Sequence, residues 1–185
     1  MKQTIISRFL AIALMMTTGN LAANAGWTDN LSPYDLNAPL GWATVDGNVT
    51  GGEGGTKVTV TNKAELMNAL KGTDKKIIYV DGEIEFSGLT NVKSVQNKTI
   101  IGMKGAAFVN SKHSASVSET GIMQLSSCKN IILRNIIFKS AGAYDIDGND
   151  NLTIIGSTYI WVDHCDRQEG VEDHRDRVNV SNNRS

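Results

Sequence analysis

Short runs of β-branched residues recur along this chain at a nearly regular interval. They are KKIIYVDG from residue 75, NKTIIG from 97, NIILRNIIF from 130 and YIWVDHC from 159. The matching isoleucines are Ile77, Ile100, Ile131 and Ile160, an interval of roughly 20 to 30 residues, which is typical of a solenoid. Strands without an intervening helix favour a β-helix. The sequence therefore predicts an all-β protein, a parallel β-helix whose inward residues stack on the coil before.

Two asparagines fit the same interpretation. Asn97 and Asn130 each stand just ahead of an isoleucine run, where asparagine suits a turn and its amide can bond along a stack. The alternative is a β-sandwich with irregular strand spacing. A sandwich requires hairpin signals such as Asn-Gly between neighbouring strands, and these are largely absent.

One helix is expected over residues 62–72, NKAELMNALKG. Asn62 is placed to cap it, Glu65 stands at the capping-box position, and Gly72 ends it. An amphipathic helix there would cover the open first coil, whose strand edges need protection.

Residues 1–25 have the pattern of a secretory signal peptide. Lys2 and Arg8 precede a short apolar run, and Ala23-Asn24-Ala25 is an A-x-A cleavage site. Residues 26–185 are then one exported domain, with no stretch long enough to span a bilayer. A net charge of −1 favours neither nucleic acid nor an anionic membrane as a partner.

The WVDHC segment raises three possibilities: a zinc site, a Cys–His nucleophile pair or a scaffold strand. Three histidines and two cysteines without metal-ligand spacing argue against zinc. Because His164 and Cys165 are adjacent, they are expected to point to opposite faces of a strand, with His164 on the side of Ile160 and Val162. A scaffold strand is favoured. Whether Cys128 and Cys165 form a disulfide stays open.

These segments together resemble the pectate lyase family of polysaccharide lyases. The resemblance rests on IWVDHC with DNLTIIGS before it, on the glycine-rich GWATVDGNVTGGEGG and the helix after it, and on KKIIYVDGEI, NKTIIG and NIILRNIIF in that order. It implies a right-handed parallel β-helix with a short N-terminal capping helix. It also implies cleavage of polygalacturonate or pectin by β-elimination with Ca²⁺ as cofactor, in a secreted protein that we expect to be a monomer.

The resemblance also implies a set of calcium ligands. The family aspartate eleven residues before the tryptophan corresponds to Asp150, and the acid-x-x-x-Asp pair of the next coil corresponds to Glu172 and Asp176. Oxygen ligands of this kind suit Ca²⁺. A fourth ligand is in question, because Gly148 occupies its position and Asp147 is one place off. DIDGND also resembles the start of an EF-hand, but Gly156 stands where the loop needs a glutamate.

Two departures from the family pattern bear on activity. The family's catalytic arginine lies on coils that would follow residue 185, so we expect the 185-residue chain alone to be inactive. The tail has Arg167 and Arg175 where the family usually has an aromatic residue. A rival interpretation is therefore a non-catalytic β-helix that binds acidic polysaccharide or serves as a surface scaffold.

Overall fold

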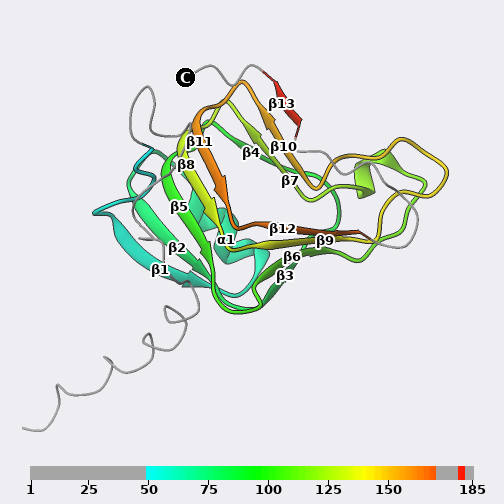
Figure 1. Cartoon of the computed structure of the whole chain (residues 1–185), viewed down its shortest axis with the longest axis horizontal. Helices are drawn as coiled ribbons and strands as arrows, with labels where there is room; N and C mark the ends of the chain where they lie inside the picture. Colours follow the sequence, from blue (N-terminus) through cyan, green and yellow to red (C-terminus); the bar gives the residue numbers. More distant parts are fainter. Residues whose placement is uncertain (1–48, 170–178, 182–185) are drawn as a thin grey trace, which may run out of the picture. The chain divides into compact units, whose positions relative to one another are not determined.

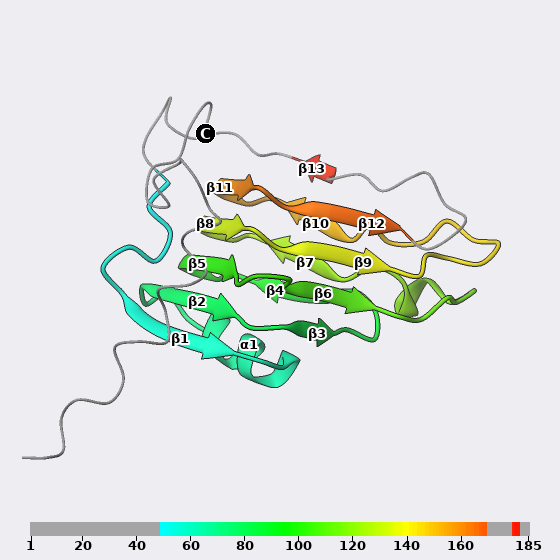
Figure 2. The ribbon, with the colours of Figure 1, turned by 60° about the horizontal axis from the view of Figure 1, so that its bottom comes forward.

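The chain winds repeatedly through three parallel sheets. The computed structural model describes residues 49–169 and 179–181. Sheet A contains β1 (Thr56–Val60), β2 (Lys76–Val80), β5 (Gln96–Gly102), β8 (Lys129–Arg134) and β11 (Thr158–Asp163). Sheet B contains β3 (Glu83–Glu85), β6 (Ala107–Asn110), β9 (Ile137–Ser140) and β12 (Asp166–Glu169); sheet C contains β4 (Thr90–Lys93), β7 (Met123–Ser126), β10 (Leu152–Ile155) and β13 (Asn179–Ser181). Figures 1 and 2 show successive coils stacked strand on strand, which confirms the predicted parallel β-helix.

The strand register shows where each coil repeats. Ile131 pairs with Ile160, as the matching of their runs predicts. The predicted match of Ile77 with Ile100 is wrong by one position, because Ile100 pairs with Ile78. The predicted match of Ile100 with Ile131 is wrong by two positions, because Ile131 pairs with Lys98. The reason for the second difference is that Lys98, and no isoleucine, occupies the inward position below Ile131.

Inward side chains of the three sheets form one continuous core. Phe108 of β6 lies 5.3 Å from Phe86, which directly follows β3, and 5.5 Å from Phe138 of β9 between ring centroids, and the second pair is edge-to-face. Such stacks add to the free energy gained from burial alone. Arg167 pairs with Phe138 in the backbone register of β9 and β12, and the sequence of β12 contains no aromatic residue. The aliphatic members of the core from sheets A and C include Ile78, Ile100, Leu133, Val92, Leu125 and Ile154.

Left-handed backbone conformations recur at equivalent positions of successive coils. Between sheets C and A the column contains Ser94, Ser127 and Gly156, with φ of 58°, 53° and 56°. Between sheets A and B it contains Asn135 and His164, with φ of 54° and 48°. Left-handed residues turn the chain sharply without a long loop. The coils that carry these residues therefore change direction at equivalent positions.

A third left-handed column forms the asparagine ladder predicted from the sequence. Asn97, Asn130 and Tyr159 have φ of 54°, 58° and 56° at the start of their sheet A strands. The Asn130 Nδ2 donates to Asn97 Oδ1 at 2.9 Å, and Asn97 Nδ2 donates to the Thr73 carbonyl at 2.8 Å. Tyr159 takes the next position, so the described ladder has two asparagines.

The ladder also holds the glycine-rich segment that precedes β1. Asn130 Oδ1 accepts hydrogen bonds from the backbone N–H groups of Thr50 and Gly51 at 2.9 and 2.8 Å. Gly52 N donates to Thr99 Oγ1 at 2.9 Å. A Cβ at Gly52 would lie 1.9 Å from the Lys76 carbonyl oxygen, so the close approach to β2 requires glycine.

The predicted helix is confirmed as α1 (Lys63–Leu70), and it packs against β1 and β2. Asn62 Oδ1 accepts from Glu65 N at 3.0 Å, as a capping asparagine should. Glu65 Oε2 accepts from Thr61 N at 2.9 Å, one residue earlier than in the standard capping box. Leu66 and Leu70 are buried in the core, so the helix covers the first coil.

A buried lysine ties the turn after this helix to the second coil. Lys98 is 0% exposed, and its ammonium donates to the carbonyls of Gly72 at 3.2 Å, Gln96 at 2.9 Å and Asp74. The Asp74 carboxylate lies 3.7 Å from the same nitrogen. Buried charge is tolerated when it is paired and hydrogen-bonded in this way. Hydrophobic periodicity does not predict this role.

The predicted signal peptide, residues 1–25, lies outside the described residues. Among the residues that the structure does describe, no helix has the length and apolar character needed to cross a membrane.

Replacing Lys98 should destabilise the first two coils. Lys98→Met leaves three carbonyl oxygens without their donor, and we expect a loss of about 3 kcal/mol of unfolding free energy in urea titrations. The exposed Lys104 provides the control, since Lys104→Met should change stability by less than about 0.5 kcal/mol. Equal effects of the two substitutions would contradict the assigned role.

Removing the centre of the ladder should be similarly costly. Asn130→Ala loses the contacts to Asn97 and to the segment at Thr50 and Gly51, and it places alanine at a left-handed position. We expect about 3 kcal/mol of destabilisation by chemical denaturation. Asn91→Ala, at an exposed strand position, is the matched control and should be nearly neutral.

Candidate calcium site at the start of β10

Of the three carboxylates predicted to bind calcium, the described residues include Asp150. It lies two residues ahead of β10, where that strand enters sheet C, and it is half-buried. Its carboxylate makes no hydrogen bond or ion pair within the described part of the chain. Glu172 and Asp176 lie outside the described residues. A half-buried carboxylate without a protein partner is suited to bind a cation.

Two stacked loops lie beside Asp150. Residues 111–122 connect β6 to β7, and residues 141–151 connect β9 to β10; we call this pair the side lobe, visible in Figures 1 and 2 beyond the ends of β6 and β9. A parallel bridge joins Ser114 to Ala143, and Tyr144 N donates to the Ser114 carbonyl at 3.0 Å. The His113 and Tyr144 rings meet edge-to-face at 5.6 Å. The loop that carries Asp150 is therefore supported by the loop of the preceding coil.

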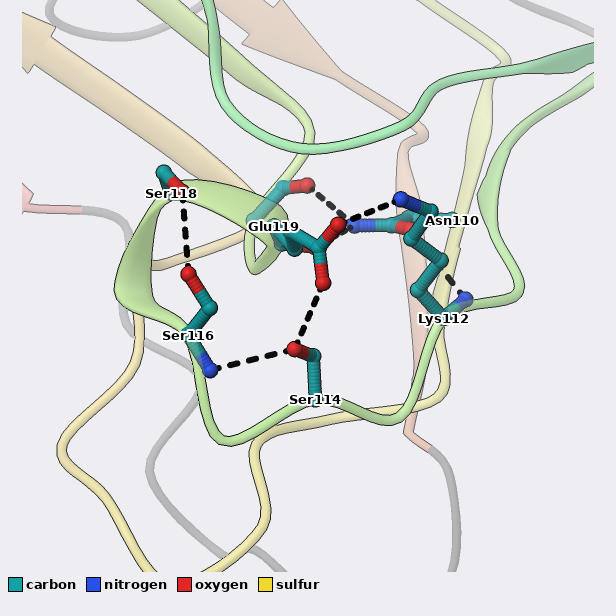
Figure 3. A network of polar contacts seen from close by, with 7 residues as sticks. Asn110, Lys112, Ser114, Ser116, Ser118 and Glu119 are labelled. Carbon is teal, nitrogen blue, oxygen red and sulfur yellow. Dashed lines mark hydrogen bonds and ion pairs between the residues drawn. The ribbon is translucent and has the colours of Figure 1, made fainter.

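The loop of residues 111–122 has its own polar network, shown in Figure 3. Glu119 binds the Lys112 ammonium at 2.6 Å through Oε1, and it accepts from Ser114 Oγ at 2.8 Å through Oε2. These hydrogen bonds lower the pKa of Glu119, with the Lys112 contact as the largest cause. The carboxylate is thus engaged within the loop, and the loop is fixed by charge-assisted bonds.

The other acids of the loop at residues 141–151 are exposed. Asp145 and Asp147 stand at the surface, and Asp145 has a left-handed backbone with φ of 53°. Exposure and a left-handed backbone are typical of residues in turns. The loop is flanked by the strands β9 and β10, so the rejection of an EF-hand is confirmed by the absence of flanking helices within residues 137–155.

Sheet C presents a polar outer face next to Asp150. Its inward residues are apolar apart from Thr90, and its outward residues form two rows across the strands, which are Asn91, Gln124 and Thr153 in one and Lys93, Ser126 and Ile155 in the other. The Gln124 amide donates to Ser126 Oγ at 2.8 Å. Amide and hydroxyl groups at strand spacing can bond to the hydroxyls of an extended saccharide.

The WVDHC segment is a scaffold strand with one correction to its predicted faces. Ile160 and Val162 of β11 pack on the core. His164 adopts a left-handed conformation at the corner after β11, which breaks the strand alternation. As a result Cys165 packs against the core, and His164 is half-exposed; the predicted assignment of these two residues is wrong.

Asp163 lies between two basic side chains on the outer side of this strand. Its Oδ1 lies 2.7 Å from His164 Nδ1, and its Oδ2 lies 3.0 Å from Arg134 Nε. The Arg134 contact has ion-pair distance without hydrogen-bond alignment. Arg134 is 2% exposed, and its guanidinium carbon lies 5.4 Å from the Trp161 ring centre. The role of Arg134 cannot be predicted from the sequence, because it stands among apolar residues and its outward position is covered.

Both cysteines are free thiols. Cys128 Sγ donates to the Val92 carbonyl at 3.3 Å at the corner before sheet A, whereas Cys165 contacts the Leu133 carbonyl at 3.8 Å at the corner after it. Burial raises the pKa of Cys128, and it raises the pKa of Cys165 to about 11. The open question of a disulfide is thereby answered, and Cys165 stays protonated at neutral pH, which is the wrong state for a nucleophile.

The sequence matches a known protein family over most of its length. The family model described as pectate lyase matches residues 11–179. This chain belongs to the pectate lyase family. It is 35% identical over 129 residues to a pectate lyase of Emericella nidulans, covering 69% of this chain and 35% of that protein. It is 36% identical over 120 residues to a pectin lyase of Pectobacterium carotovorum, covering 63% and 35%.

A third relative and a solved structure are similar over a larger part of the chain. A pectate trisaccharide-lyase of Bacillus licheniformis is 34% identical over 151 residues, covering 77% of this chain and 40% of that protein. A Bacillus subtilis pectate lyase variant superposes with a TM-score of 0.55 at 24% identity, covering 75% of this chain and 52% of that chain. The latter likeness supports the fold alone. The chain spans about a third of the length of the curated relatives it matches.

The thiols provide a direct test of the corner geometry. At neutral to mildly alkaline pH, both should resist alkylation by iodoacetamide in the native chain and react fully after denaturation, as mass spectrometry would show. Non-reducing and reducing gels should give the same mobility. Rapid native labelling of Cys165 would contradict its half-buried, protonated state.

Proposed function

We propose that this chain belongs to a secreted, calcium-dependent pectate lyase that cleaves polygalacturonate by β-elimination. The observation that carries the proposal is the position of Asp150. It is an unpaired, half-buried carboxylate within the described residues, at the point where a sheet with a polar outer face begins. Secretion rests on the predicted signal peptide at residues 1–25, and polygalacturonate or pectin is the proposed partner.

The register between β10 and β13 supports the ligand set. Thr153 pairs with Asn179, and Asp150 and Asp176 each stand three residues ahead of these partners in the sequence. Neighbouring parallel strands lie about 4.8 Å apart, so equal offsets favour two carboxylates that share one cation. Glu172 precedes Asp176 by four residues and supplies the third proposed ligand.

The chemistry explains why a cation is needed. In β-elimination a base removes the C5 proton of a uronate, a double bond forms between C4 and C5, and the C4–oxygen bond breaks as the leaving sugar oxygen takes up a proton. A calcium ion held at this site would supply positive charge beside the C6 carboxylate and would stabilise the negative charge that develops there. Asp150, Glu172 and Asp176 would hold the cation, and the amides and hydroxyls of sheet C would bind the sugar hydroxyls. The arginine base of the family has no counterpart assigned in this chain.

The proposal is tested with the chain and with the product of its complete coding sequence. The complete product should release unsaturated uronides from polygalacturonate, detected by ultraviolet absorbance, and EDTA should abolish the release. The 185-residue chain should show little or no turnover but should bind Ca²⁺ in isothermal titration calorimetry. Lyase activity that survives EDTA would contradict calcium dependence, and a calcium-binding complete product without turnover would favour the scaffold interpretation.

A matched pair of substitutions tests the assignment of Asp150. Asp150→Asn should weaken Ca²⁺ binding by at least about tenfold, because one anionic ligand is lost. Asp145→Asn changes the same loop at an exposed position and should leave the affinity unchanged. Equal effects would show that the loop contributes only its net charge.

A further inference from the structure

The residue before Asp150 is held by three hydrogen bonds from the preceding coil. Asn149 N donates to Thr120 Oγ1 at 2.8 Å. The Asn149 side-chain amide donates to the Val117 carbonyl at 2.6 Å and, more weakly, to the Thr120 carbonyl at 3.5 Å. Asn149 is therefore fixed through both its backbone and its side chain, directly next to the proposed ligand.

Thr120 is itself held on both sides. It is 2% exposed, and its hydroxyl donates to the Val117 carbonyl at 2.8 Å while accepting from Asn149. The fully buried Asn110 donates to the carbonyls of Glu119 at 2.9 Å and Gly121 at 2.8 Å, the residues on either side of Thr120. Figure 3 shows Asn110 in contact with this turn. The backbone on both sides of Thr120 is thus held by the buried end of β6.

The loops of residues 111–122 and 141–151 are also closely packed at Gly121. A Cβ at Gly121 would lie 2.7 Å from Asn149 Cβ and 2.8 Å from the Asp150 carbonyl oxygen. Gly121 has φ of 73°, so this position favours glycine for two reasons. The backbone of Asp150 therefore packs against Gly121, and the preceding residue, Asn149, is held by hydrogen bonds.

We propose that Thr120 is a positioning residue for calcium binding, acting through Asn149 on the carboxylate of Asp150. The proposal rests on the proposed function, since it assumes that Asp150 binds the cation. A carboxylate held in place before the ion arrives loses less conformational freedom on binding, so the affinity is higher. Thr120 lies on the coil of β5, β6 and β7, whereas Asp150 lies on the next coil, that of β8, β9 and β10. The other two proposed ligands follow in the sequence.

The test compares substitutions of one hydroxyl. Thr120→Val keeps the shape of the side chain but loses both hydrogen bonds, and we expect Ca²⁺ affinity of the chain to fall about tenfold in calorimetry with calcium chloride. Thr120→Ser restores the hydroxyl and should keep the affinity within about twofold. Ser116→Ala removes an exposed hydroxyl of the same loop, which contacts Ser118 and has no link to Asn149, and it should have no effect. Thermal unfolding in EDTA records the stability of each metal-free variant.

The outcomes separate this inference from the proposed function. If the unaltered chain binds Ca²⁺ and Asp150→Asn weakens binding, but Thr120→Val binds within about twofold of the unaltered chain, the positioning role is overturned while the ligand assignment stands. If the unaltered chain does not bind Ca²⁺, both proposals fail. If Thr120→Val does not fold, Asn149→Ala takes its place; it removes the contact to Val117 and should weaken binding about fivefold. Unchanged affinity in that variant would overturn the role.

Discussion

The parallel register of successive coils is the constraint on which the rest of this structure depends. Each strand repeats the inward and outward positions of the strand below, so the core of one coil is continued by the next. The register persists because left-handed residues such as Ser94 and Ser127 turn every coil at the same place. Loops of different length can then leave the stack without disturbing it, and the side lobe is one of them.

Much of this fold can be predicted from local signals. The repeat of isoleucine runs, the stacking of Asn97 on Asn130 and the capped helix at Asn62 all involve residue types whose conformational preferences are strong. The predictions fail where a single residue breaks a pattern. Lys98 occupies an inward position that hydrophobic periodicity assigns to an apolar residue, and the left-handed conformation of His164 reverses the alternation that places Cys165.

The candidate site can be predicted in part. Asp150 is identified through its fixed offset from the tryptophan of β11, which the resemblance to the family supplies. Thr120 and Asn149 cannot be found in this way, because their contact joins two loops of unequal length from different coils. Contacts of that kind follow from the path of the backbone and leave no periodic trace in the sequence.

Lys98 also has a consequence for how the two ends of the stack depend on solution conditions. Three carbonyl oxygens and a carboxylate surround its nitrogen, which is the type of oxygen cage that proteins commonly fill with a metal ion. Here a covalently attached ammonium fills the cage. The helix-capped end therefore carries an internal counter-ion that no chelator can extract, whereas the proposed site at β10 must draw its cation from the surroundings.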